Sequence, residues 1–328
     1  MKKECRLPTI EQIHKELPLS GQEKISLFRK SINDILLGND PRLLVIVGPC
    51  ALQDADSAIE YGKRLFKLQQ RVKERLFLVM RAYAEKPRTR SSWKGFVHSH
   101  EGSVAKGIIE TRQLLLALTE IGIALATEFV SPFLADYFSD LISWGAIGAR
   151  TVLSPVHREL ASRLPMAIGM KNTLDGTFEP AICAIESVSQ EQPTIITATS
   201  GSVCQAYSPG NPYAHLVLRG GNGGPNYTRV KKAKDLLHEA RLQEAILVDC
   251  SHGNSQYMWE RQPKVCKEVL EHSLPFIQGI MVESFLCGGT GDAIGSGHSV
   301  VDGCLGWDET EKLIVHAHRQ CALTRKDL

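Results

Sequence analysis

Four side chains that can bind a metal stand where short apolar runs end. Cys50 follows LLVIVGP, His252 follows AILVDCS, Glu283 ends GIMV, and Asp302 lies in SVVDGCLGWDET. A thiolate, an imidazole and two carboxylates are a suitable ligand set for a divalent transition metal. Singly, such residues are more often buried hydrophobes, loop residues or caps. Together they favour a metal site over a Cys50–Cys250 disulfide, which a reducing compartment would disfavour.

Cationic side chains form a second set around the ends of the same kind of run. Its members are Arg81, Lys86, Arg88, Arg150, Lys171 and Arg219. Exposed ion pairs contribute only about 0–1 kcal/mol, so stability is a poor reason for this concentration, although long cations also solvate strand ends. Arginine supplies a fork for phosphate or carboxylate, and lysine supplies a movable charge. The set predicts a site for anionic substrates.

A glycine-rich stretch, RGGNGG, begins at Arg219. It lacks both the Lys-Ser/Thr ending of a Walker loop and the GxGxxG spacing of a dinucleotide loop. We interpret it as a flexible substrate loop, with a plain connector as the alternative.

The composition is that of an ordinary globular protein: 328 residues, 43% hydrophobic and 23% charged, with a formal net charge of +2. So small a charge, without a polybasic run, argues against nucleic-acid binding. We find neither a signal peptide nor eighteen consecutive apolar residues, so we expect no membrane partner and a cytoplasmic location. Nine scattered cysteines are expected to be reduced thiols.

Short apolar runs alternate with helical patterns along most of the chain, which is typical of repeated βα units around a parallel sheet. Nine such runs are one too many for a barrel of eight. The turn-rich segment from Thr194 to Pro212 is the best candidate for a hairpin inserted before the sixth barrel strand. The sequence therefore predicts an α/β fold, a (β/α)8 TIM barrel. The nine runs are Leu43–Gly48, Leu76–Arg81, Ala124–Phe129, Gly145–Ala149, Met166–Met170, Thr194–Ala198, His215–Arg219, Ala245–Asp249 and Gly279–Glu283.

Helical patterns fill the spaces between these runs. An N-terminal extension, residues 1–40, carries an amphipathic helix at Ser20–Leu37 with Gly38 as its C-cap. It is too short to be an independent domain and is expected to pack on the barrel or on a neighbouring subunit, with residues 41–328 as the catalytic barrel. The expected barrel helices include Ala55–Arg75, Ser103–Ile121, Pro132–Ser143, Asp175–Ser187, Thr228–Ala240 and Arg261–His272.

The motifs taken together resemble the type I 3-deoxy-7-phosphoheptulonate (DAHP) synthases, in the branch that includes the feedback-regulated bacterial and yeast enzymes. The resemblance runs from about Asn39 to Thr310. Its segments are GNDPRLLVIVGPC, VMRAYAEKPRTRSSWKG, SWGAIGARTVLSPVHRELAS, LRGGNGGPNY, LVDCSHGNS, GIMVES and GHSVVDGCLGWDET. It implies an aldol-type condensation of phosphoenolpyruvate with erythrose 4-phosphate and water, which yields DAHP and phosphate as the first step of the shikimate pathway.

The resemblance also implies roles for individual residues. One divalent ion, Mn, Fe, Co or Zn, is implied at Cys50, His252, Glu283 and Asp302. The residues implied to bind phosphoenolpyruvate are Arg81, Lys86, Glu128, Arg150, Lys171 and Arg219. Those implied to bind erythrose 4-phosphate are Lys86, Arg88 and Thr89, with the metal ligand Asp302 beside them. A homodimer or homotetramer is expected.

Lys86 is the candidate proton donor in this scheme, because a lysine beside other cations can have a lowered pKa. Cys50 and His252 would serve catalysis through the metal. Two alternatives remain open. One is the related 3-deoxy-manno-octulosonate 8-phosphate synthase, which typically has an Asn where this chain has Arg88. The other is a catalytically silent barrel with a regulatory or binding role.

Overall fold

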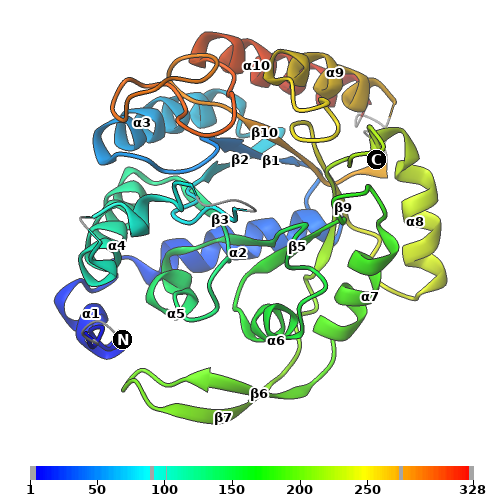
Figure 1. Cartoon of the computed structure of the whole chain (residues 1–328). Coiled ribbons are helices and arrows are strands. Elements are labelled where there is room, and N and C mark those ends of the chain that lie inside the picture. The colour runs from blue at the N-terminus through cyan, green and yellow to red at the C-terminus, as the bar shows by residue number, and fades with distance from the viewer. Residues whose placement is uncertain (1–4, 89–91, 101, 273–275, 325–328) are drawn as a thin grey trace.

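Eight parallel strands close into a barrel in the computed structural model, which describes residues 5–88, 92–100, 102–272 and 276–324 (Figure 1). The spatial order of the strands is β1-β10-β9-β8-β5-β4-β3-β2, and β1 pairs with β10 to complete the circle. This confirms the predicted α/β barrel. The strands are β1 (Leu43–Gly48), β2 (Leu76–Arg81), β3 (Ala124–Glu128), β4 (Trp144–Ile147), β5 (Ala167–Lys171), β8 (His215–Leu218), β9 (Ile246–Asp249) and β10 (Gly279–Glu283).

The barrel strands are buried along their whole length, because helices cover their outer face and side chains fill the interior. Figure 1 shows the helices arranged around the outside of the barrel. They are α3 (Ala55–Val72), α4 (Val104–Ile121), α5 (Ala135–Phe138), α6 (Pro155–Arg163), α7 (Glu179–Val188), α8 (Val230–Glu239), α9 (Gln262–His272) and α10 (Trp307–Thr324), with 3-10 turns η1 (Phe96–His98), η2 (Ser139–Leu141), η3 (Tyr227–Arg229) and η4 (Trp259–Arg261).

The predicted helix Pro132–Ser143 is wrong in length. The structure has only the single turn α5 and the 3-10 turn η2 there. Arg29 donates to the carbonyl oxygens of Ser139 and Ile142 at 2.7 and 3.0 Å, so these acceptors serve a tertiary contact rather than a continued helix. The sequence pattern could not show this, because Arg29 lies more than a hundred residues away.

The N-terminal segment forms two helices, α1 (Ile10–Glu16) and α2 (Gln22–Leu36). Helix α2 lies across the barrel (Figure 1), and its Ile32 and Ile35 are buried in the same apolar cluster as Leu44 of β1. Phe28 packs edge-on against Phe77 at a centroid distance of 6.2 Å. The residue that caps α2 is Leu37 rather than Gly38, which follows it with φ at +78°. The helix therefore closes the end of the barrel at which the strands begin.

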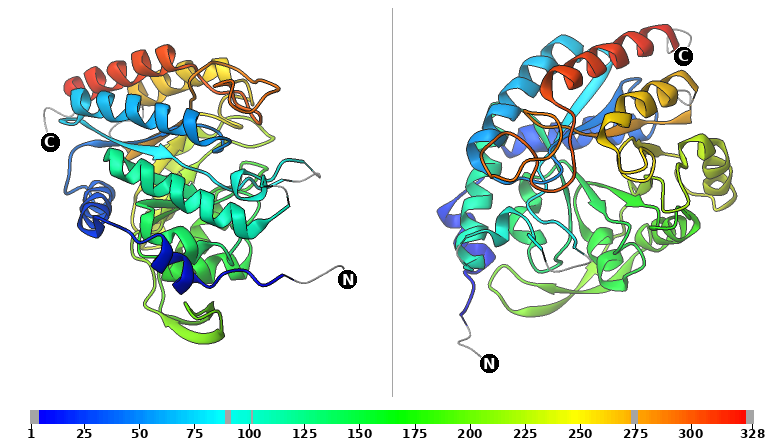
Figure 2. Two further views of the ribbon diagram at one scale, coloured as in Figure 1. Left: turned by 90° about the vertical axis from the view of Figure 1, so that its left-hand side faces the viewer. Right: turned by 45° about the horizontal axis from the view of Figure 1, so that its top comes forward.

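Two antiparallel strands, β6 (Gln192–Thr197) and β7 (Val203–Ser208), follow β5 and precede β8 along the chain. They form a ribbon that is separate from the barrel (Figure 1). They occupy the segment for which the surplus strand predicted a hairpin. Apolar side chains at positions 195, 203 and 207 are exposed on the ribbon. The two turned views in Figure 2 show the ribbon extending away from the body of the barrel. In the part of the chain that the structure describes, no helix has the length and apolar character needed to span a membrane.

Candidate active site

Three side chains that can bind a metal, one thiol and two carboxylates, meet at the C-terminal rim of the barrel. The ligand atoms of Cys50, Glu283 and Asp302 all lie within 4.8 Å of one another. Cys50 follows β1 and Glu283 ends β10, and these strands are paired neighbours, with Gly48 opposite Glu283. Asp302 comes from the loop after β10, and its Oδ2 accepts a hydrogen bond from Cys50 Sγ at 3.3 Å. Cys50 and Glu283 are buried, whereas the Asp302 side chain is 57% exposed.

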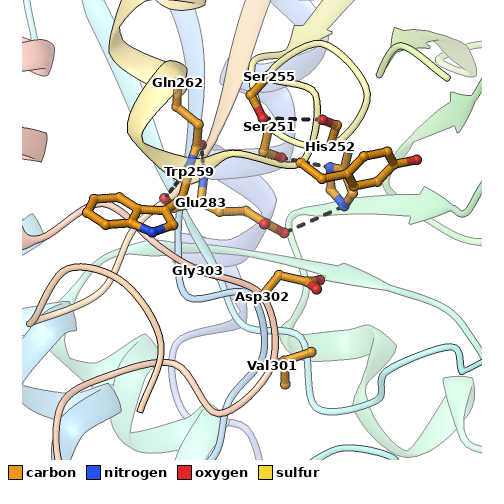
Figure 3. A pocket seen from close by; sticks show the side chains of 10 residues that line it. Ser251, His252, Ser255, Trp259, Gln262, Glu283, Val301, Asp302 and Gly303 are labelled. Atoms are coloured by element: carbon orange, nitrogen blue, oxygen red, sulfur yellow. Dashed lines mark hydrogen bonds and ion pairs between the residues drawn. The ribbon is translucent and has the colours of Figure 1, made fainter. Parts of the chain in front are cut away.

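His252 approaches this cluster from the loop after β9. Its Nε2 lies 3.7 Å from Glu283 Oε1, and Figure 3 shows the two side chains pointing toward each other. Its Nδ1 lies 3.0 Å from Asp249 Oδ2 and 2.7 Å from Ser251 Oγ. Since Nδ1 has these partners, Nε2 is the nitrogen that is available to a ligand. His252 stands at the edge of the cluster, next to Glu283.

Lys86 is the cation nearest to the cluster. Its Nζ donates to Cys50 Sγ at 2.8 Å and lies 3.5 Å from Asp302 Oδ2. Burial alone lowers the pKa of Lys86, but attraction to Cys50, Glu283 and Asp302 outweighs it and raises that pKa above its ordinary value. The prediction of a lowered pKa for Lys86 is therefore wrong. It considered the neighbouring cations, whereas the closer neighbours are acidic.

Burial, and to a smaller extent repulsion from Glu283, raises the pKa of the Cys50 thiol well above its ordinary value. The Lys86 ammonium beside Cys50 opposes this rise in pKa but does not outweigh it. The donor atoms of this rim nevertheless fit a divalent transition metal, because one sulfur, two carboxylates and an imidazole Nε2 lie close together. The same cluster already attracts a cation, the Lys86 ammonium. A bound metal would displace the thiol proton.

Arg81 ends β2 and is completely buried. Its Nη2 donates to Glu283 Oε1 at 2.9 Å, its Nε donates to the Pro49 carbonyl at 3.2 Å, and its guanidinium lies 4.1 Å from the ring centroid of Tyr83. The guanidinium thus fixes one oxygen of Glu283. Tyr83 was not singled out from the sequence, since a tyrosine two residues past a strand gives no distinctive signal.

Lys171 ends β5 and is buried between two carboxylates. Its Nζ lies 3.6 Å from Glu128 Oε2 and 3.6 Å from Asp249 Oδ2. Burial alone raises the pKa of both carboxyl groups. For Glu128 the attraction of Lys171 outweighs burial, and for Asp249 the attraction of His252 and Lys171 does so, which leaves both pKa values below their ordinary range. Asp249 was missed from the sequence, although it ends a strand just as Glu283 does and the same signal could have found it.

The other predicted cations differ in exposure. Arg219, after β8, is buried, and its Nη2 lies 3.4 Å from the Tyr257 hydroxyl. Arg150 and Arg88 are exposed, and Arg88 Nε donates to Ser92 Oγ at 2.6 Å. Thr89 lies outside the described residues. The rim therefore buries Arg81, Lys171 and Arg219 and leaves Lys86 partly exposed, whereas Arg88 and Arg150 stand at the surface.

Three asparagines hold the glycine-rich segment after β8. Gly220 N–H donates to Asn226 Oδ1 at 2.8 Å, and Asn226 N–H donates to Asn254 Oδ1 at 2.8 Å. Asn172 Oδ1 accepts from the Arg219 N–H at 2.7 Å. Gly220 has φ at +68°, and a Cβ there would approach Asn254 N to 2.3 Å. The segment is thus pinned against two other rim loops, and these contacts fix the backbone of Arg219.

A cavity of about 220 Å³ opens beside the cluster. Figure 3 shows its walls coming from the loops after β9 and β10, with Glu283 at the end of β10 between them. Its size suits a small molecule rather than a polymer. The lining residues are Ser251, His252, Ser255, Tyr257, Trp259, Gln262, Glu283, Val301, Asp302 and Gly303.

Comparison with known proteins places the chain in a family. The model of the DAHP synthetase I family matches residues 16–314. The Trp-sensitive phospho-2-dehydro-3-deoxyheptonate aldolase of Escherichia coli K12 is 43% identical over 300 residues, with 87% of this chain and 86% of that protein covered. The Tyr-sensitive enzyme of the same organism is 40% identical over 330 residues, with 95% and 92% covered.

A solved structure gives the same result. The phospho-2-dehydro-3-deoxyheptonate aldolase of Francisella tularensis SCHU S4 superposes with a TM-score of 0.95 at 37% identity, with 98% of this chain and 99% of that chain covered. Sequence and fold therefore agree over almost the whole length. The chain belongs to the DAHP synthetase I family.

Proposed function

We propose that the C-terminal rim, with its cluster of one thiol and two carboxylates and its buried cations, is the active site for the reaction of this family. The chain condenses phosphoenolpyruvate with erythrose 4-phosphate and water to give DAHP and phosphate, the first step of aromatic amino-acid biosynthesis. The observation that carries the assignment is the convergence of Cys50, Glu283 and Asp302 beside Lys86 in a chain of this family.

Four residues would hold one divalent metal ion: Cys50 through Sγ, His252 through Nε2, and Glu283 and Asp302 through carboxylate oxygens. Manganese, iron, cobalt and zinc all suit this mixed donor set, and availability would select among them. When bound, the metal supplies a Lewis acid for the aldehyde oxygen of erythrose 4-phosphate. Arg81 supports the site because it fixes one oxygen of Glu283.

Phosphoenolpyruvate carries a phosphate and a carboxylate, and a water-poor site must neutralise both. Buried Lys171, Arg219 and Arg81 would supply most of this charge, with Arg150 at the surface and Lys86 on the metal side. Glu128 is assigned to the same pocket, where it holds the Lys171 ammonium in position.

Erythrose 4-phosphate would bind between the metal site and the loop that follows β2. Arg88 and Thr89 are assigned to its phosphate, while Lys86 and Asp302 face its reacting end. Arg88 is exposed, which suits a group that receives a phosphate from solvent.

The carbon–carbon bond forms between C3 of phosphoenolpyruvate and the aldehyde carbon. Water adds to C2, and phosphate leaves with cleavage of its C–O bond. Lys86 is the proposed proton donor to the developing alkoxide. Its raised pKa keeps it an ammonium at neutral pH, so it enters the reaction with a proton to give. Cys50 and His252 serve the reaction as metal ligands.

The two alternatives can be separated by a steady-state assay. We expect turnover with phosphoenolpyruvate and erythrose 4-phosphate, and at least about a hundredfold lower kcat/KM with a five-carbon sugar phosphate, because Arg88 stands where the related octulosonate synthase typically has Asn. Preference for the five-carbon sugar would favour that synthase, and failure to turn over either sugar would favour a silent barrel.

We also propose that residues 41–328 form one catalytic domain, the barrel. Residues 1–40 are then an N-terminal extension of it and not a domain of their own. The supporting observation is that α2 buries Ile32 and Ile35 against the barrel strands. A homodimer or homotetramer and a cytoplasmic location remain our proposals, the latter supported by nine free cysteines. Sedimentation of the purified chain would test the oligomeric state.

A further inference from the structure

Asp249 stands between the two halves of the rim, and a single oxygen of its carboxylate faces both. It ends β9 and is completely buried. Its Oδ1 accepts from both the N–H and the hydroxyl of Ser251. Its Oδ2 lies 3.0 Å from His252 Nδ1 and 3.6 Å from Lys171 Nζ. One oxygen therefore faces both a proposed metal ligand and a proposed substrate-binding cation.

We propose that Asp249 is a positioning residue that couples metal binding at His252 to phosphoenolpyruvate binding at Lys171. The inference rests on the proposed function, which places the metal and the anion at these two residues. It adds that the two binding events help each other through one shared oxygen.

The direction of the coupling follows from competition for Oδ2. A metal on His252 Nε2 would withdraw electron density from the imidazole, which makes its Nδ1 edge more positive and strengthens its attraction to Asp249 Oδ2, 3.0 Å away. Lys171 is then less neutralised and attracts an anion more strongly. Conversely, an anion that engages Lys171 leaves Oδ2 to His252, which becomes a more basic ligand. Binding linkage is reciprocal, so each ligand tightens the other, by roughly fivefold or more.

Replacement by asparagine breaks this link without changing the size of the side chain. The carboxylate accepts from Ser251 on one oxygen and faces His252 and Lys171 with the other. Asparagine has one acceptor oxygen and one NH2 group, so either Ser251 or His252 meets a donor instead of an acceptor. Loss of such a support to a ligating histidine typically weakens metal affinity about 10–100-fold.

Glu128 provides a matched control. It is buried, and its carboxylate lies 3.6 Å from Lys171 Nζ, the same distance as that of Asp249. Within the described part of the chain, its ion pair is with Lys171 and not with His252. Glu128→Gln therefore removes the same charge from Lys171 and leaves the support of His252 intact.

The test is a chelator competition on the full-length, Mn²⁺-loaded chain, with and without saturating phosphoenolpyruvate and without erythrose 4-phosphate. In the wild type, phosphoenolpyruvate should tighten Mn²⁺ binding about fivefold or more. In Asp249→Asn, Mn²⁺ affinity should fall about 10–100-fold and the effect of phosphoenolpyruvate should shrink to less than about twofold. Glu128→Gln should retain Mn²⁺ affinity within about threefold in the absence of phosphoenolpyruvate. Wild-type coupling in Asp249→Asn, or equal loss in both variants, would overturn the inference.

Lys171→Met tests the other end of the link and serves if Asp249→Asn does not fold. Without the Lys171 ammonium, Asp249 Oδ2 interacts with His252 alone of these two residues. Mn²⁺ should therefore bind more tightly than in the wild type when phosphoenolpyruvate is absent. Unchanged or weaker Mn²⁺ binding would contradict the link. A wild-type chain that binds neither Mn²⁺ nor phosphoenolpyruvate would instead contradict the proposed function, so the two failures are distinguishable.

Discussion

Buried polar groups are paired more completely in the barrel interior than at the C-terminal rim. In the interior, Trp144 Nε1 donates to His215 Nε2 at 3.1 Å, and His215 Nδ1 lies 2.9 Å from the Tyr213 carbonyl. This histidine has protein partners on both nitrogens and is neutral, because burial lowers its pKa to about 4. Polar groups that the protein itself satisfies need no ligand.

At the rim, some buried charged groups face each other at separations longer than a hydrogen bond, although Arg81 does bind Glu283 directly. Lys171 Nζ is 3.6 Å from both of its carboxylates, and His252 Nε2 is 3.7 Å from Glu283 Oε1. The fold thus completes the buried polar contacts of His215, where only stability is at stake. Where it leaves charges close but incompletely paired, we propose that small ligands complete the arrangement.

The largest expected effect tests the rim. Lys86→Met removes the proposed proton donor and should lower kcat by at least about a hundredfold, since general acid catalysis typically contributes 10²–10⁴-fold. Lys94→Met is the matched control, because Lys94 lies in the same loop with an exposed side chain. Steady-state kinetics of both variants should show the loss in the first alone. A Lys86→Met enzyme with nearly normal kcat would remove Lys86 from the chemistry.

A smaller effect separates the two anion pockets. Arg150→Ala should raise the Michaelis constant for phosphoenolpyruvate about tenfold, whereas Arg88→Ala should do so for erythrose 4-phosphate, because a charge-assisted contact is worth about 1.5–3 kcal/mol. Both arginines are exposed, which limits the risk to folding. The measurement is a full two-substrate kinetic analysis of each variant. If Arg88→Ala altered phosphoenolpyruvate use alone, the assignment of its loop would be wrong.

A change at His215 in the barrel interior should affect stability and its pH dependence, with little effect on catalysis. Between the unfolded pKa of His215, about 6.5, and its folded value of about 4, the unfolded chain binds more protons. The free energy of unfolding should therefore fall as the pH drops through this window, by on the order of 3 kcal/mol for this group. Denaturant titrations from pH 7 to pH 4 would measure it.

The matched variant for this measurement is His215→Asn, which cannot titrate. It should be less stable at pH 7, where it loses the fitted imidazole, but its stability should change less between pH 6.5 and pH 4. Its kcat should stay close to that of the wild type, because His215 lies in the interior. An equally steep pH dependence in the variant would show that other groups cause the loss.

Much of the fold could be predicted from the sequence, because barrel strands buried on both faces appear as separate apolar runs. The runs Leu43–Gly48, Leu76–Arg81 and Gly279–Glu283 match β1, β2 and β10. The helix after β3 was predicted too long, since Arg29, which binds carbonyls there, is remote in sequence. Helices α6 and α10 were not among the helices named from the pattern.

The site was predictable in kind but not in its contacts. Strand ends identified Cys50, Glu283 and Lys171, because parallel strands deliver their last residues to one rim. The pairing of Lys171 with Asp249, and the acidic surroundings of Lys86, depend on which strands become neighbours when the barrel closes. Those proximities set the pKa values, so the lowered pKa predicted for Lys86 was wrong in direction.

The proposed function requires that the rim bind a divalent metal. The most direct measurement follows metal content and activity together while the purified chain is treated with a chelator and then with one equivalent of Mn²⁺. We predict that activity falls in proportion to the metal removed and returns with about one ion per chain, and that Cys50→Ala binds no metal at this site. Full activity in a chain verified to be free of metal would contradict the account.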